Sequence, residues 1–249
     1  MIVAAAICPS PPLLATELTG QADILPELRA ACAAAVARLL AAEPDVVVVV
    51  GPAETTGPCD PAGELSLASF APALRQGRPL ATPPLPLALG IGAMLLDDAG
   101  YTGPRTLHGI AEVEPAAACL ALGRQLAASA PRVALLAVGD GTARRSASAP
   151  GYLDERAGPF DEAVARAVSE GDLPAIAALD PALAAALLAA GRPAWQTLAG
   201  ALSAAAPQAG YRAADRPAAD RPAASRPHTT VLYSDAPLGV AYLVATLIP

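Results

Sequence analysis

The chain has 249 residues, 54% of them apolar, which is ample material for the core of one large α/β domain or two small ones. All 16 basic residues are arginine and 23 residues are acidic, so the formal net charge is −7. This balance excludes a basic surface for the phosphate backbone of nucleic acid. The N-terminal apolar run lacks the basic start of a signal peptide, and no uninterrupted apolar run approaches the roughly 20 residues of a membrane span. We therefore expect an acidic cytoplasmic protein with no nucleic-acid or membrane partner, and a homodimer is the commonest assembly of such chains.

Apolar runs rich in β-branched residues occur at 2–7, 45–51 and 132–141. Because these runs do not alternate with polar residues, we expect strands that are covered on both faces. Apolar residues recur at helical spacing within 25–44, between the first two runs, with one proline near the start and one at the end. This arrangement predicts a β-α-β unit at the beginning of the chain.

Further helices are expected in five segments: 85–99, 115–129, 159–171, 180–191 and 193–205. The chain closes with two predicted strands, 229–235 and 239–248, although the second could also be a helix. Strands that alternate with helices predict a single α/β domain over 1–249, with three layers (α/β/α) and a mixed, mainly parallel central sheet. The five-residue repeat in 213–227 contains too much proline for a packed element, and we expect a surface loop or a disordered insertion there.

Three polar turns follow the predicted strands, and ligands bind at the carboxyl ends of strands in open α/β sheets. The candidate binding residues in these turns are Cys8, Ser10, Glu54, Thr55, Thr56, Asp140, Thr142, Arg144 and Arg145. In the third turn, glycines that expose backbone N–H groups and two arginines suit an anion. Asp140 could instead fold back onto the arginines and simply hold the loop. Each turn could also be structural only, because Pro, Gly, Asp and Thr are ordinary turn residues.

The two histidines offer little for catalysis. His108 is expected in a loop before a helix, and His228 is expected to open a strand after the repeat. No GxSxG motif is present, so a Ser-His-Asp hydrolase is disfavoured. A metal site built from histidines is also hard to assemble, because neither histidine has another ligand close to it in sequence.

Four stretches in order, "ICPSPPLL", "PDVVVVVGPAETT", "VGDGTARR" and the helical segment from "FDEAVARAVSEGD" to "RPAWQTLAGAL", resemble the LigB-like family of class III extradiol dioxygenases and the related Memo-like proteins. The resemblance covers 1–205 and resumes at 229. It implies a LigB-like α/β/α fold, with Fe(II) held by two histidines and a carboxylate and with a further histidine as acid/base.

This chain departs from the family pattern at all four of those positions. Cys8 stands where the first histidine ligand is expected, and Pro52-Ala53-Glu54 where the second is expected. The stretch Gly139–Ala143 lacks the acid/base histidine, and Gly191-Arg192-Pro193 lacks the carboxylate. Fe(II) oxygenases need imidazole and carboxylate ligands on one face of the metal. We therefore expect that the dioxygenase chemistry and its Fe(II) are lost, that no other cofactor is needed, and that the crevice binds a small anionic ligand or a protein partner.

Three alternatives remain open. The chain could be an enzyme of altered mechanism, oxidoreductase-like or with Cys8 as a nucleophile, in which case Arg144 or Arg145 would have to lower the pKa of the thiol. A different metal site could use Cys8, Glu54, Cys59 and Asp60, since thiolates and carboxylates can hold zinc. The protein could also be a purely structural subunit, if apolar side chains fill the crevice.

Overall fold

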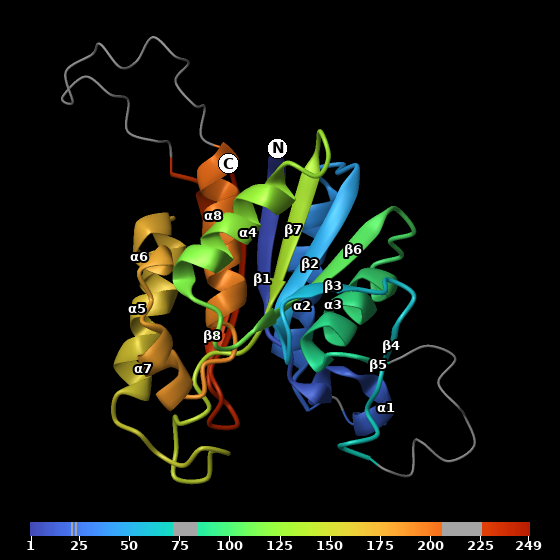
Figure 1. Ribbon diagram of the computed structural model, residues 1–249. Coiled ribbons are helices and arrows are strands. Elements are labelled where there is room, and N and C mark those ends of the chain that lie inside the picture. Colours follow the sequence, from blue (N-terminus) through green and yellow to red (C-terminus); the bar gives the residue numbers. More distant parts are fainter. Residues whose placement is uncertain (21, 23, 72–83, 206–225) are drawn as a thin grey trace, which may run out of the picture.

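The computed structural model describes the chain except residues 21, 23, 72–83 and 206–225. A seven-stranded sheet lies between two layers of helices (Figure 1). Its strand order is β3-β6-β2-β7-β1-β9-β8. The strands are β1 (Ile2–Cys8), β2 (Val46–Ala53), β3 (Gly57–Cys59), β6 (Arg105–Ala111), β7 (Val133–Val138), β8 (His228–Asp235) and β9 (Tyr242–Ile248).

The central strands β6, β2, β7 and β1 are parallel, whereas β3, β9 and β8 run antiparallel to their neighbours. Successive side chains in β2 show why the strand has no polar alternation. Val47 and Val49 pack into one core and Val48 and Val50 into the other. Both faces of the sheet are therefore buried, and the predicted three-layer α/β/α fold with a mixed, mainly parallel sheet is confirmed.

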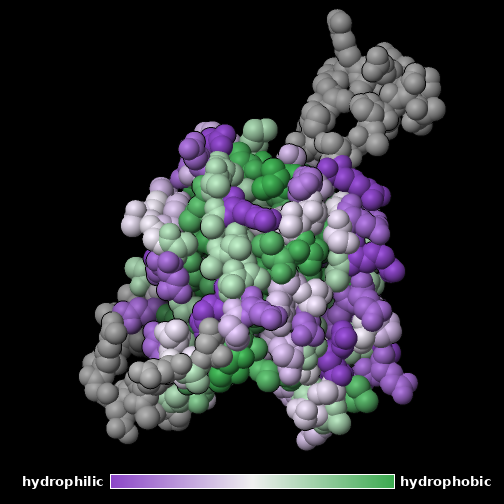
Figure 2. All heavy atoms as spheres, turned by 180° about the vertical axis from the view of Figure 1, so that it is seen from behind, coloured by the Kyte–Doolittle hydropathy of each residue, from purple (hydrophilic) through white to green (hydrophobic). Residues whose placement is uncertain are grey.

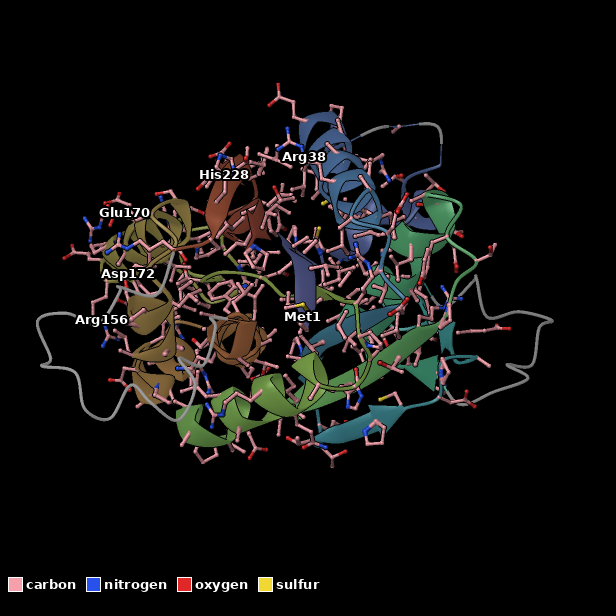
Figure 3. All side chains as sticks on the ribbon, turned by 90° about the horizontal axis from the view of Figure 1, so that it is seen from above. Met1, Arg38, Arg156, Glu170, Asp172 and His228 are labelled. Atoms are coloured by element: carbon pink, nitrogen blue, oxygen red, sulfur yellow. The ribbon has the colours of Figure 1, made fainter. Side chains whose placement is uncertain are left out.

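Helices α2 (Pro26–Leu40) and α3 (Leu87–Asp98) cover one face of the sheet. Figure 3 shows α2, which carries Arg38, on the opposite side of the sheet from α4 and α8. The second face is covered by α4 (Ala116–Ala127), α5 (Ala157–Ser169), α6 (Leu173–Ala177), α7 (Pro181–Ala186) and α8 (Arg192–Ala205). The remaining elements are short: η1 (Pro12–Leu14), α1 (Thr16–Thr19) and the paired strands β4 (Glu64–Leu65) and β5 (Pro84–Leu85).

Helices α4 and α8 approach each other closely through two glycines. A Cβ atom added at Gly123 would lie 2.0 Å from the carbonyl oxygen of Thr197. One added at Gly200 would lie 2.3 Å from the carbonyl oxygen of Leu120. The two backbones can pack at this distance only because neither residue has a side chain.

The structure corrects several expectations about single elements. His108 lies within β6 rather than in a loop, and burial lowers the pKa of its imidazole. The helix expected over 180–191 ends earlier, because the chain enters the left-handed region at Leu188 (φ 56°). His228 does open a strand, β8, and the last element is the strand β9. Most of the 213–227 repeat lies outside the described residues, and no helix in the described ranges is long and apolar enough to cross a membrane.

Candidate functional site

The thiol of Cys8 is buried on the α2 side of the sheet. Cys8 is fully inaccessible to solvent and belongs to the core that α2 contributes to, where it lies against Cys32. A hydrogen bond with the Cys32 thiol and burial both raise the pKa of Cys8 well above its usual value. A nucleophilic cysteine needs a lowered pKa and access to substrate, so the structure argues against that role for Cys8.

The four residues of the alternative metal site lie too far apart to share one ion. Cys59 is on β3 at one edge of the sheet, and β6, β2 and β7 separate it from β1, which ends in Cys8. Four strand spacings correspond to about 19 Å, whereas ligands of one zinc ion lie within about 4 Å of each other. Glu54 and Asp60 are exposed, and the described part of the chain contains no cluster of three or more His, Cys, Asp or Glu side chains that could hold a metal.

The turn after β2 is tied to its own edge of the sheet. The Thr56 hydroxyl donates to the Glu114 carboxylate and accepts a hydrogen bond from the backbone N–H of Ala111 (3.0 Å), at the end of β6. Glu54 and Thr55 beside it are exposed. The strands β7 and β1 lie between this turn and β9, so the turn is about 14 Å from that strand. The loop that contains Arg144 and Arg145 lies beside the start of β9, since the Arg145 N–H donates to the carbonyl of Gly239 (3.0 Å). The structure therefore does not bring Thr55 and Thr56 together with these arginines.

Asp140 and Ser10 do meet, where β7 and β1 end. The backbone N–H of Ser10 donates to Asp140 Oδ1 at 2.6 Å, and the Ser10 hydroxyl lies 3.5 Å from the same oxygen. Burial raises the pKa of Asp140 to about 6, although the Ser10 hydrogen bonds act in the opposite direction. Among the described interactions, Asp140 makes no ion pair with Arg144 or Arg145, so the expected alternative of a loop held by that pair is wrong.

A carboxylate of the protein itself, from α5, occupies the place that was predicted for an external anion at the loop after β7. Asp161 of α5 accepts hydrogen bonds from the Thr142 N–H (3.0 Å) and hydroxyl (2.6 Å), and from Arg145 Nη1 at 3.2 Å. The Gly141 N–H is used as well, since it donates to the carbonyl of Ala241 (2.8 Å). Burial raises the pKa of Asp161, and these donors oppose that rise. The predicted anion-binding groups are therefore largely satisfied within the protein.

Close backbone packing fills the space between the end of β7 and α8. A Cβ atom at Gly139 would lie 2.6 Å from the Cα of Gly191. One at Gly191 would lie 2.4 Å from the ring of Trp195. Gly191, at the position where the resemblance predicts a carboxylate ligand, is thus packed against the end of β7. With no imidazole in this region, a buried thiol facing α2 and an exposed Glu54, the donor set does not fit Fe(II).

A pocket of about 200 Å³ opens on the other side of this loop, between α5 and the β8–β9 pair. Its lining residues come from the loop, α5, α8 and the two strands: Gly141, Arg145, Asp161, Glu162, Val164, Ala165, Trp195, Ser234, Asp235, Ala241, Tyr242 and Leu243. Of the residues predicted for a site, only Arg145 lines the pocket. Thr142 and Asp140 do not line it, although Thr142 donates to the lining residue Asp161 and Asp140 precedes the lining residue Gly141. Arg144 Nε is buried and has no hydrogen-bond partner among the described residues.

Trp195 of α8 lines the pocket, and its indole nitrogen lacks a hydrogen-bond partner among the described residues. Trp195 is only 1% exposed, and its indole Nε1 has no hydrogen-bond partner in the described part of the protein. A buried donor without a partner is costly, so this part of the core keeps an unmet hydrogen-bonding group. Sequence reasoning missed Trp195 and Asp161, although both could have been noticed: Trp195 is the single tryptophan of the chain, and Asp161 follows the Phe of an amphipathic helix.

The pocket carries more negative than positive charge. Its lining contains the acidic residues Asp161 and Glu162 of α5 and the basic residue Arg145. Asp235 also borders the pocket, but its side chain lies on the α2 face of β8, beside Tyr233. Figure 2, which shows the molecule from behind, has hydrophilic side chains gathered along the edge formed by α5–α7. The pocket, which α5 lines, therefore lies next to this polar edge.

Comparison with known proteins establishes the fold alone. No family model matches the chain, and no curated protein matches it. Among solved structures, the chain is similar to that of the uncharacterized protein JW3007 from Escherichia coli K12, with a TM-score of 0.51 and 17% sequence identity. The match covers 99% of this chain and 100% of the other. At this identity the similarity supports a shared architecture, which leaves function to be argued from the site.

Proposed function

We propose that this protein is a LigB-like fold that binds a small molecule without performing extradiol dioxygenase chemistry. The observation that carries the proposal is the pocket of about 200 Å³ between α5 and β8–β9, which Trp195 of α8 helps to line. Concave sites with a few polar groups on an otherwise apolar lining are typical of ligand binding. Val164, Ala165 and Leu243 supply the apolar part of this lining.

The strand ends support the second half of the proposal. The Cys8 thiol faces α2, and Gly139 and Gly191 are packed against each other where the family would bind iron and substrate. Asp140 has a pKa near neutrality but contacts Ser10 rather than an open cavity in the described structure. A catalytic acid or base must reach a substrate, so the geometry favours binding over catalysis.

The single tryptophan makes the proposal directly testable. In a ¹H–¹⁵N spectrum of the labelled protein, the indole N–H of Trp195 gives the one tryptophan side-chain signal. We would titrate three amides of equal carbon-chain length: valeramide (neutral), δ-aminovaleramide (cationic) and glutaramate (anionic). At least one should shift the indole signal saturably, because Trp195 lines the pocket and a bound molecule changes the surroundings of its ring.

Two variants control this experiment. Ala165→Leu places extra atoms in the pocket and should abolish the shift, whereas Ala163→Leu changes the same helix at a residue outside the pocket lining and should retain it. Failure of all three amides to move the signal would contradict the proposed binding site. The protein would also be loaded with Fe(II) under anaerobic conditions and then given catechol and oxygen. Ring opening of the catechol would contradict the proposed loss of dioxygenase chemistry.

A further inference from the structure

The two edges of the seven-stranded sheet differ in how they are protected against further pairing. At one edge, β3 has only three residues, and its central residue is Pro58, which has no N–H to donate. At the other edge, β8 has eight residues and contains neither proline nor lysine. Short length, proline and lysine are common features that stop an edge strand from pairing with another chain. The edge at β3 has two of these features, and β8 has none of them.

The outer edge of β8 is accessible. None of its eight residues is buried, and no strand in the described ranges pairs with this edge. Every second residue of an edge strand turns its N–H and C=O away from the sheet, so β8 presents a row of backbone donors and acceptors. The irregularity between Val231 and Tyr233 adds local twist, but regular pairing with β9 continues on both sides of it. An extended backbone carries the matching row of groups.

The flanking helices limit what can pair with this edge. Helix α2 packs on β8 from one face and α5 from the other, and α5 lies over β8 itself. Figure 3 shows His228 at the periphery of the molecule, between Arg38 of α2 and Glu170 at the end of α5. If a second copy joined its β8 to this one, the two α5 helices would lie about 5 Å apart, whereas packed helices need 8–10 Å. The edge therefore has room for a single extended segment and not for a second sheet with its helices.

The charge near the end of β8 indicates which segment fits. Burial raises the pKa of Tyr233, and the negative charges of Asp235 and Glu27 raise it further, so both carboxylates lie near its hydroxyl. Neither carboxylate makes an ion pair with a residue in the described ranges. Antiparallel pairing is the commoner arrangement, and it would bring the N-terminal part of an added strand to this end of β8. A basic residue there would be attracted by both carboxylates.

We infer that β8 binds an extended peptide segment by antiparallel strand addition, with a basic residue near the N-terminal end of that segment. Main-chain hydrogen bonds along β8 supply the affinity, and Asp235 and Glu27 supply the preference for the basic residue. This inference does not rest on the proposed small-molecule function. Its test reads the amides of β8, whereas the small-molecule test reads the indole of Trp195, so either can fail alone.

Amide hydrogen exchange on the ¹⁵N-labelled protein tests the inference. The probe is an acetylated and amidated eight-residue peptide of alternating threonine and valine, with arginine as its second residue. At ten times its Kd, the outward-facing amides of β8 should exchange roughly 10-fold more slowly, and those of β3 should not change. Unchanged exchange in β8 at millimolar peptide would overturn the inference. Protection of β8 without peptide, in a protein that light scattering shows to be a dimer, would assign the edge to a second copy and overturn it as well.

Two modified peptides separate strand addition from binding through side chains alone. One carries N-methyl groups on its odd-numbered residues and the other on its even-numbered residues, so their side chains are identical. Only one row of peptide amides can face β8, so one form should lose binding and the other should retain it. Equal binding of both forms would show that main-chain hydrogen bonds are not used, and the inference would fail.

Matched charge-neutral variants locate the basic residue. Asp235→Asn keeps the oxygen that accepts the Ala236 N–H but removes the charge. It should weaken binding of the arginine peptide roughly two- to five-fold, and it should leave binding of a peptide with glutamine at that position unchanged. Glu43→Gln makes a similar change at an exposed residue beyond the other end of α2 and should alter neither affinity. Equal losses in both variants would overturn the placement of the basic residue beside Asp235.

Discussion

The ends of β1, β2 and β7 and the space between α5 and the β8–β9 pair are neighbouring regions with opposite characters. The first holds most of the polar residues that the sequence offers, yet its groups are paired internally or packed, as with Ser10 on Asp140 and Gly139 on Gly191. The second contains fewer conspicuous residues but keeps an open pocket and an unsatisfied buried donor. The difference teaches that polar residues gathered at strand ends do not by themselves leave open space for a ligand.

The largest expected effect is on the free energy of unfolding, at Gly191 in the packed region. Gly191→Ala should lower the free energy of unfolding by about 3 to 4 kcal/mol, because the added methyl group would meet the Trp195 ring and the Asp140 carbonyl oxygen. Gly158→Ala is the control, since nothing lies within 4 Å of its added methyl group in α5, and it should be neutral or stabilising. Urea unfolding measures both changes, and a Gly191→Ala protein as stable as the parent would show that this region is open.

The next effect concerns Asp140, the half-buried carboxyl at the strand ends. Because the folded pKa of Asp140 is raised from 3.8 to about 6, the folded state holds this proton more tightly than the unfolded chain does. Its contribution is fully present below pH 4 and is lost as the pH rises through about 6, with an upper limit of about 3 kcal/mol. Asp140→Asn should remove that part of the pH dependence of unfolding. An unchanged profile in the variant would place Asp140 in contact with solvent.

The smallest of these effects is a difference in reactivity among the four cysteine thiols. Cys59 is partly exposed, whereas Cys8, Cys32 and Cys119 are buried, so a disulfide reagent should modify Cys59 roughly 100-fold faster than the other three. Cys59→Ser should remove the fast phase and leave the slow one. A fast phase that disappears only in Cys8→Ser would restore Cys8 as a reactive residue and reopen the strand ends as a site of chemistry.

The sequence could predict much of this fold because the core strands consist almost entirely of apolar residues. The run Val46–Val50 cannot be stable unless both its faces are covered, and that requirement alone indicates a buried parallel sheet. In contrast, β6 contains Arg105, Thr106, His108 and Gly109, and its strand conformation depends on pairing with β2 and β3. No local pattern carries that information.

The candidate site was less predictable, for a physical reason. The sequence indicates that Thr142 and Arg145 are hydrogen-bond donors for a negatively charged group. In the structure that group is the carboxylate of Asp161 in the following helix, α5. A sequence shows what a group can bind, whereas only the fold shows whether another part of the chain already fills that role. Trp195 is the converse case, since an indole in an apolar helix looks like ordinary core until its nitrogen is found without a partner.

The contact between α4 and α8 makes the pocket depend on residues that do not touch it. Gly123 sits against the carbonyl of Thr197, two residues beyond Trp195 on α8. In a chain as rich in alanine as this one, alanine is the substitution that most positions tolerate, but here it would force the two helices apart and move the indole with them. The spacing of the α4 and α8 backbones thus fixes the position of Trp195, so that a substitution remote from the pocket lining can displace a residue that borders the pocket.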